Sequence, residues 1–221
     1  MPRPLVLVGA GEFAQIACEY FQHDSDYDVV AFSVESDHLA QPTLAERPVV
    51  AYETLAAHYP PEEVDLFVAI PASQLNRLRT RFYQDARQRG YRLATYVSSR
   101  AFVWRNAEVG ENSFIFEGNV IQPFVRIGNN CILWSGNHIG HRTVVQDNVF
   151  VSSHAVVSGY CDIGAGSFVG VNSTFNDHVK IARDNVIGAG ALVTRDTEPG
   201  RVYVGSPARA VPDRSSFDVR L

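Results

Sequence analysis

The chain has 221 residues, 46% of them hydrophobic and 19% charged, with a formal net charge of -5 at pH 7. This length suffices for one large domain or two modest ones, and the composition excludes a disordered tail and a disulfide-stapled miniprotein. The balance of 19 Lys and Arg against 24 Asp and Glu includes no basic run, so no nucleic-acid partner is indicated.

No apolar run approaches the 18 residues of a membrane span, and the short run 4–10 continues into Gly11 and Glu12 rather than into a signal-peptide cleavage site. We therefore expect a cytoplasmic protein with no membrane partner. Three cysteines, Cys18, Cys131 and Cys161, show neither metal-ligand spacing nor a disulfide framework. They are interpreted as packed thiols.

The first part of the chain predicts a small α/β domain. Residues 5–8 form a buried-strand run that ends in the segment 9–14, followed by a helix through about Phe21 and a second strand over 29–34. The segment 9–14 has the pattern Gly-x-Gly-x-x-Ala between a strand and a helix. This pattern is typical of a tight turn with packing glycines, and its position also favours nucleotide binding.

Three further elements complete this domain. A strand is expected over residues 65–70, and an amphipathic helix over 73–89 with Leu75, Leu78 and Phe82 on one face. Residues 92–97 are expected to form the strand that leads into the second domain. The sequence thus predicts a Rossmann-like α/β domain over 1–97 and a second domain over 98–221.

An internal repeat of six residues dominates the second domain. Sixteen consecutive positions at this spacing are apolar, and the positions two residues earlier are all small or medium-sized. Residues i and i-2 of a strand point to the same face, so each six-residue segment directs one bulky and one small side chain inward. The bulky positions are Val103, Val109, Ile115, Ile121, Ile127, Leu133, Ile139, Val145, Val151, Val157, Ile163, Val169, Phe175, Ile181, Ile187 and Val193.

Three such segments close one triangular coil of eighteen residues. The array then makes about five coils, a prism roughly 25 Å tall at ~4.8 Å between stacked strands. Glycine follows the bulky residue at positions 110, 128, 140, 164, 170 and 188. We expect these glycines to occupy turns that require positive φ.

The repeat resembles that of the hexapeptide-repeat transferases, whose fold is an all-β left-handed parallel β-helix. The tandem of an α/β domain and such a prism, with the closing segment 199–209, resembles the sialic-acid and bacillosamine type of sugar acetyltransferases. This resemblance implies transfer of an acetyl group from acetyl-CoA to a nucleotide-linked amino sugar, a precursor of a bacterial glycan. It also implies a homotrimer with acetyl-CoA bound between subunits, and no metal.

The segment 135–141, Ser-Gly-Asn-His-Ile-Gly-His, carries the candidate base. In the family this motif places the catalytic histidine at the position of His141, two residues after the inward Ile139 and at a corner of the prism. Gly159 lies eighteen residues on and so one coil above, where its backbone amide is a candidate donor to the thioester carbonyl. His138 is the alternate base, and we also count it among the substrate-binding candidates.

Arg142 departs from the family pattern, which often follows the histidine with Glu or Asp. An adjacent cation lowers the pKa of a histidine. Either a carboxylate arrives from elsewhere in the trimer or the base acts unaided on an amine, and acetylation of a hydroxyl remains an alternative.

The resemblance also implies the binding residues. The acetyl-CoA positions match Phe150, Gly159, Val171 and Ala189. The nucleotide-sugar positions match Gly11, Glu12, Phe13, Glu35, Pro71 and Gln74. Glu35, after the second strand, is interpreted either as an acceptor for a ribose or base or as a solvated strand end.

Two other classes of function remain open. A γ-type carbonic anhydrase shares this fold and binds zinc with three histidines, but His141 and His178 lie about two coils or 10 Å apart, too far to share a metal within one subunit. A non-catalytic trimeric scaffold with an α/β ligand sensor is the other class. The sequence does not distinguish among uridine, guanosine and thymidine nucleotides.

Overall fold

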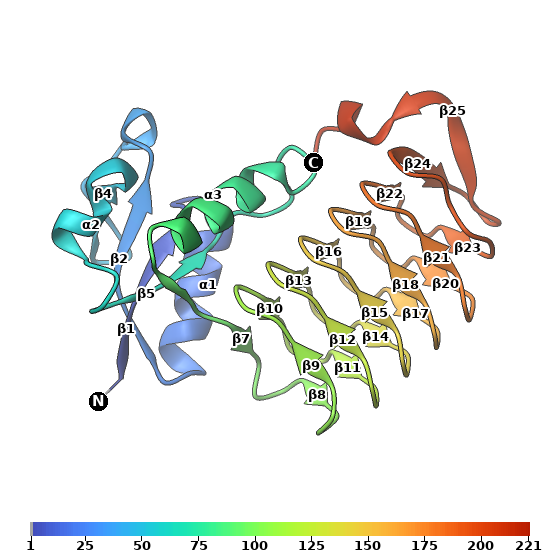
Figure 1. Ribbon diagram of the computed structural model, residues 1–221, viewed down its shortest axis with the longest axis horizontal. Coiled ribbons are helices and arrows are strands. Elements are labelled where there is room, and N and C mark those ends of the chain that lie inside the picture. Colours follow the sequence, from blue (N-terminus) through green and yellow to red (C-terminus); the bar gives the residue numbers. More distant parts are fainter. Residues whose placement is uncertain (1) are drawn as a thin grey trace. The chain divides into compact units, whose positions relative to one another are not determined.

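The computed structural model describes residues 2–221 and divides into two compact units. Unit 1 extends to Pro71 and resumes over Arg79–Tyr96, and unit 2 comprises Ala72–Leu78 and Val97–Leu221 (Figure 1). Among the described residues, no helix is long and apolar enough to cross a membrane.

Unit 1 is built on a six-stranded sheet of order β3-β4-β2-β1-β5-β6. All neighbours in it are parallel except β3 and β4. Its strands are β1 (Arg3–Val8), β2 (Tyr27–Val34), β3 (Thr43–Leu44), β4 (Arg47–Ala51), β5 (Asp65–Val68) and β6 (Arg92–Leu93). Its helices are α1 (Glu12–His23), α2 (Leu55–His58) and most of α3 (Arg77–Gln88), with short 3-10 turns η1 (Ser36–His38) and η2 (Tyr52–Thr54). The predicted βαβ unit is therefore present as β1, α1 and β2.

The expected helix over 73–89 begins later than predicted. Gln74, Leu75 and Asn76 have φ angles of 54°, 51° and 64°, in the left-handed region. Leu75 packs instead against Val186 and Val202 of unit 2, and the Asn76 side chain donates to the carbonyl of Gly166 at 3.0 Å. Because these tertiary contacts replace the first helical turn, α3 starts only at Arg77.

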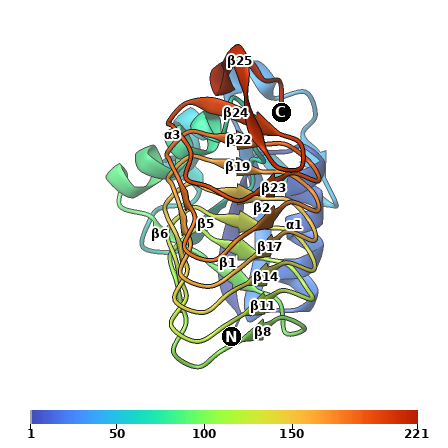
Figure 2. The same ribbon diagram turned by 90° about the vertical axis from the view of Figure 1, so that its right-hand side faces the viewer.

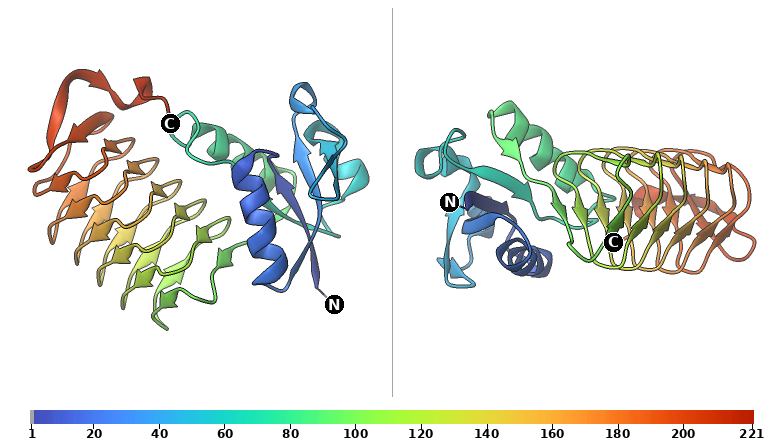
Figure 3. Two further views of the ribbon diagram at one scale, coloured as in Figure 1. Left: turned by 180° about the vertical axis from the view of Figure 1, so that it is seen from behind. Right: turned by 90° about the horizontal axis from the view of Figure 1, so that it is seen from below.

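Unit 2 is a prism of three parallel sheets. The first face has the order β25-β24-β22-β19-β16-β13-β10-β7, the second β23-β20-β17-β14-β11-β8 and the third β21-β18-β15-β12-β9. Figures 2 and 3 show the successive coils stacked over one another. First-face strands are β7 (Tyr96–Val97), β10 (Phe114–Ile115), β13 (Ile132–Leu133), β16 (Phe150–Val151), β19 (Phe168–Val169), β22 (Val186–Ile187), β24 (Arg201–Val204) and β25 (Arg209–Ser215), the last of which is antiparallel to β24.

The other two faces consist of two-residue strands. Second-face strands are β8 (Phe102–Val103), β11 (Val120–Ile121), β14 (His138–Ile139), β17 (Val156–Val157), β20 (Thr174–Phe175) and β23 (Leu192–Val193). Third-face strands are β9 (Glu108–Val109), β12 (Arg126–Ile127), β15 (Val144–Val145), β18 (Asp162–Ile163) and β21 (Lys180–Ile181). The register advances by eighteen residues, as Ile121 pairs with Ile139 and Ile139 with Val157. The predicted fold class, an α/β domain followed by a β-helix, is confirmed.

The bulky column forms the core of the prism. Members such as Ile139 and Phe175 have no exposed surface and belong to one hydrophobic cluster. Polar members of the small column bind the backbone of neighbouring coils: the Asn137 Oδ1 accepts from the amide of Ala155 at 2.7 Å, and Thr143 Oγ1 donates to the carbonyl of Ser158 at 2.9 Å. These buried polar groups are therefore paired, as a tightly packed interior requires.

The prediction that the glycines after the bulky residues occupy turns with positive φ is wrong. Those that follow a bulky residue do not have positive φ, which occurs two residues later in each turn, often at a residue other than glycine, such as Arg142 and Tyr160 at 58°. A Cβ at Gly140 would lie 2.6 Å from the amide nitrogen of Gly159 in the next coil. The glycine is needed there because adjacent backbones approach closely.

All three cysteines are buried thiols, as expected, and none forms a disulfide within residues 2–221. Burial raises the pKa of the Cys161 thiol to about 11 and also raises that of Cys18. Both are therefore thiols rather than reactive thiolates at neutral pH.

Candidate active site

His141 lies at the turn between the second and third faces of the prism, after β14 and before β15. Two hydrogen bonds fix the backbone of His141 at this turn. The amide donates to Oε1 of Gln122 at 2.9 Å, and the carbonyl accepts from the amide of Tyr160, also at 2.9 Å. The side chain is exposed, so the imidazole is accessible to a substrate.

The imidazole of His141 occupies the space where a side chain on Gly159 would lie. A Cβ on Gly159 would lie 2.5 Å from Cε1 and 2.9 Å from Nε2 of His141. The Gly159 amide donates to Oδ1 of Asp177 at 2.9 Å. In this structure the hydrogen bond of the Gly159 amide therefore goes to a carboxylate, and the role of this amide as a donor to the thioester carbonyl stays a prediction.

The neighbours of the imidazole are aromatic. The rings of His141 and Tyr160 lie 5.1 Å apart at 82°, and Tyr160 stacks on His178 at 4.9 Å and 14°. The Arg142 guanidinium lies over the Phe124 ring, 4.4 Å from its centroid. Within residues 2–221, no carboxylate forms an ion pair with His141.

His138 lies on β14, opposite Val120 and Val156 in the neighbouring coils. Ile139 points into the core, so alternation directs His138 outward on the second face. It is half-buried. His138 and His141 therefore occupy different surfaces, a flat face and a turn.

The residues matched to acetyl-CoA do not gather at one place in the chain. Val171 and Ala189 are exposed and lie one coil apart at the turn between the first and second faces. Gly159 lies at the turn between the second and third faces. Phe150 is buried on the first face and stacks on Phe168 at 5.3 Å, so its ring does not line either turn.

The glycine-rich segment of unit 1 opens α1. Gly11 is exposed and caps the helix, and a Cβ on it would meet nothing within 4 Å. Gly9 is the constrained residue, because its φ is 125° and a Cβ added to it would lie only 2.7 Å from the carbonyl oxygen of Ala69. Glu12 is exposed, whereas Phe13 is buried and packs edge-on against Phe67 at 6.3 Å. Phe13 is thus a core residue.

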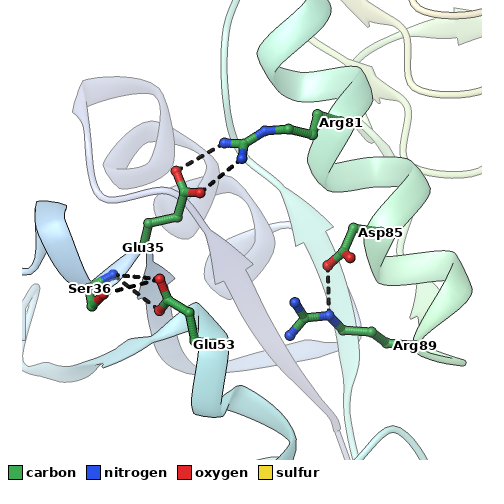
Figure 4. A network of polar contacts seen from close by, with 6 residues as sticks. All are labelled: Glu35, Ser36, Glu53, Arg81, Asp85 and Arg89. Atoms are coloured by element: carbon green, nitrogen blue, oxygen red, sulfur yellow. Dashed lines mark hydrogen bonds and ion pairs between the residues drawn. The ribbon is translucent and has the colours of Figure 1, made fainter.

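Glu35 belongs to a polar network at the end of β2 (Figure 4). Its two carboxylate oxygens accept from the two terminal nitrogens of Arg81, each at 2.9 Å. The Arg81 guanidinium lowers the pKa of Glu35 below its usual value. A neighbouring carboxylate, Glu53, accepts from both the amide and the hydroxyl of Ser36 at 3.1 Å.

These groups border a cavity of about 190 Å³. Its lining residues are Glu35, Tyr52, Glu53, Arg81, Phe82, Asp85 and Arg89. Arg81 and Glu53 were missed in the sequence, since they lie 46 and 18 residues from Glu35 and no motif links them. Pro71 is exposed in unit 1, and Gln74 is exposed in the segment that belongs to unit 2.

Comparisons with known proteins agree with this architecture. Residues 106–141 match the family described as bacterial transferase hexapeptide (six repeats). A histidine-to-asparagine mutant of perosamine N-acetyltransferase from Caulobacter crescentus, in complex with CoA and GDP-perosamine, aligns with a TM-score of 0.85 and 26% identity over 95% of this chain and 97% of that chain. No match to a curated protein was found.

Two other solved structures cover the same length. The acetyltransferase domain of PglB from Neisseria gonorrhoeae has a TM-score of 0.85 at 24% identity, over 95% of this chain and 100% of that chain. WeeI from Acinetobacter baumannii has a TM-score of 0.76 at 20% identity, again over 95% and 100%.

The matched repeats and the likeness of the fold support one class of protein, an acyltransferase. Within that class, it resembles sugar N-acetyltransferases in which an α/β unit precedes the β-helix. In the described part of the chain, no three His, Cys, Asp or Glu side chains are grouped so as to hold a metal ion.

Proposed function

We propose that this protein transfers an acetyl group from acetyl-CoA to the amino group of a nucleotide-linked amino sugar. The proposal rests on the likeness to perosamine N-acetyltransferase over 95% of this chain. It also rests on an exposed histidine, His141, whose ring lies against Gly159 at a turn of the prism. Acetyl-CoA supplies the activated acyl group as a thioester.

His141 is the general base in this proposal. It accepts the proton that the sugar amine loses as the amine nitrogen bonds to the acyl carbon. The imidazolium then gives this proton to the departing sulfur, so CoA leaves as the thiol when the carbon–sulfur bond breaks. An imidazole suits this task because its ordinary pKa lies near neutrality. Amine acetylation is preferred to O-acetylation because an amine depends less on its base than a hydroxyl does, and His141 has no carboxylate partner within residues 2–221.

The acyl-donor groove is proposed to lie between two copies of the chain. Val171 and Ala189 form a strip of small exposed side chains that suits an extended pantetheine arm, whereas the buried Phe150 does not fit this role. Since this strip and His141 lie at different turns of one prism, a neighbouring copy must bring the strip to the base. Apolar side chains exposed on and beside the second face, Phe102 at 52% and Val156 at 43%, support burial against that copy.

Unit 1 is proposed to bind the nucleotide of the acceptor. Gly11 and Glu12 lie at the N-terminus of α1, where backbone amides favour phosphate. Glu35 lies after the next strand, where an acidic side chain reaches a ribose or base in dinucleotide-binding folds.

The test is an acetyl-transfer assay against a panel of nucleotide-linked 4-amino sugars, with the corresponding hydroxy sugars in parallel. We expect turnover of at least one amino sugar, and we expect His141→Asn to lower kcat by about 10² to 10⁴ with acetyl-CoA binding retained. A variant within threefold of wild type from pH 5 to 9 would remove His141 from the mechanism and favour His138. Activity that is lost on chelation and restored by zinc would instead favour the carbonic-anhydrase-like alternative.

A further inference from the structure

Within residues 2–221, no carboxylate forms an ion pair that would orient the imidazole of His141. An exposed histidine side chain samples several rotamers, and a general base must be held in one of them. The next residue is Arg142, whose guanidinium lies over the Phe124 ring rather than pairing with the imidazole. Within one chain, the groups that can hold the imidazole are therefore those in contact with its ring.

Tyr160 is the side chain in contact with that ring. Its aromatic ring lies 5.1 Å from the imidazole at 82°, an edge-to-face arrangement that fixes both distance and angle. On another side, the imidazole lies against the backbone of Gly159, where no Cβ intervenes. Tyr160 and Gly159 together define the orientation of the imidazole.

Tyr160 is itself held in place. Its amide donates to the carbonyl of His141 at 2.9 Å, so the backbones of the two residues are joined directly. Its ring stacks on that of His178, eighteen residues on, at 4.9 Å and an interplanar angle of 14°. The amide of His178 in turn donates to the carbonyl of Gly159 at 3.0 Å.

We propose that Tyr160, supported by His178, is the positioning residue for His141. This inference rests on the proposed role of His141 as the base, and it assigns to an aromatic contact the task that a carboxylate performs elsewhere. The tyrosine acts through its ring, and its hydroxyl takes no part.

The experiment compares Tyr160→Phe, which keeps the ring, with Tyr160→Leu, which removes it. Tyr160 is exposed and has φ of 58°. Leucine is unbranched at Cβ, so it adds no backbone strain beyond that already present in wild type. We expect Tyr160→Leu to lower kcat by about 10- to 100-fold, since a misplacement of about 1 Å costs up to 10²-fold. The KM for acetyl-CoA should stay within twofold, and Tyr160→Phe should keep kcat within twofold.

A spectroscopic measurement tests the same contact without activity. The imidazole protons of His141 are assigned by their loss in His141→Asn, and their chemical shifts report the ring current of residue 160. We expect these shifts to persist in Tyr160→Phe and to move toward those of a free histidine in Tyr160→Leu. His178→Leu should move them in the same direction by a smaller amount.

The outcomes separate this inference from the proposed function. If His141→Asn is inactive while Tyr160→Leu retains wild-type kcat and unchanged His141 shifts, the positioning role is overturned and the base is not. If Tyr160→Phe loses as much activity as Tyr160→Leu, the hydroxyl matters and the proposal is wrong. If His141→Asn remains fully active, the proposed base fails first. Should Tyr160→Leu not assemble, the same comparisons apply to Tyr160→Met.

Discussion

The position of the His141 imidazole depends on Gly159 having no side chain. Gly159 does not have a left-handed φ, so an alanine there is compatible with the backbone. Its Cβ would nevertheless lie 2.5 Å from Cε1 of His141, and the imidazole would have to move. We therefore expect a substitution at this glycine to displace the His141 imidazole without disturbing the core.

We expect Gly159→Ala to lower kcat by about 10- to 100-fold, in line with the cost of a displaced catalytic group. The change in the midpoint of urea unfolding should be small, because the imidazole can move outward toward solvent. The measurement is steady-state kinetics beside urea denaturation, with Ser158→Ala at the preceding position as the control. Wild-type kcat in Gly159→Ala would mean that the ring orientation does not matter.

Glu35 and Arg81 offer a second prediction at this scale. The guanidinium lowers the pKa of the Glu35 carboxyl from its ordinary value of 4.5. A carboxylate with a lowered pKa stabilises the folded state above its ordinary pKa, and this contribution is lost as the pH falls through the lowered value. The pair is partly exposed, so its contribution is modest, about 1 kcal/mol or less.

Replacing Arg81 with Met should return the pKa of Glu35 toward 4.5, as followed by NMR of the side-chain carboxyl. The difference in Tm between wild type and Arg81→Met should be constant above pH 4.5 and should shrink below it. In a Glu35→Gln background the substitution should have no pH-dependent effect. A difference that persisted unchanged at acidic pH would show that Arg81 stabilises unit 1 by packing alone.

At the scale of the elements, the six-residue period specifies which side chains enter the prism. Phe175 has no exposed surface and fills the core where the rest of the column is aliphatic. Its neighbour Thr174 points outward and is half-buried. The two positions therefore test whether the inward column carries the stability of the coil.

We expect Phe175→Ala to lower the free energy of unfolding by about 3 to 5 kcal/mol, the usual cost of emptying an aromatic site in a core. Thr174→Ala should cost less than about 1 kcal/mol. Both are measured by urea denaturation at one fixed protein concentration, because assembly would make the midpoint concentration-dependent. Equal losses in the two variants would contradict the assignment of the inward column.

For these elements, the sequence predicts the direction of side chains but not the backbone dihedral angles. Periodicity specifies the direction of side chains, so the inward column and the eighteen-residue coil were predicted correctly. It carries no information on backbone dihedrals, and for this reason the left-handed positions, such as Arg142 and Tyr160, were assigned to the wrong residues of the turn. The start of α3 was missed because Leu75 and Asn76 make contacts with residues far along the chain.

In the candidate site, too, some features could be predicted from the sequence and others could not. The motif pointed to His141, and adding eighteen residues placed Gly159 beside it. The hydrogen bond from Gly159 to Asp177 and the stack of Tyr160 on His178 also follow that spacing, but nothing in the sequence marks which side chains turn toward each other. The pair of Glu35 and Arg81 depends on the tertiary fold of unit 1, which brings together residues 46 positions apart.

At the scale of the whole molecule, the surface of the prism is unevenly apolar. The second face and the turn that follows it expose Phe102, Trp104, Phe124 and Val156 by 40% or more of their surface. The third face instead presents charged side chains such as Glu108, Arg126 and Lys180. Exposed apolar groups gathered in this way mark a surface for association.

We expect the protein to be a homotrimer, with a mass of about three times 24.4 kDa by light scattering at micromolar concentration. In a closed ring of three copies, we expect the turn that carries His141 on one copy to meet the strip of Val171 and Ala189 on the next. Val156→Glu on the second face should weaken assembly and lower activity together, because the acyl-donor groove would be lost with the interface. The matched control, Lys180→Glu on the third face, should leave both unchanged. A monomer with full activity at the same concentration would show that the groove is complete within one chain and would remove the interfacial site.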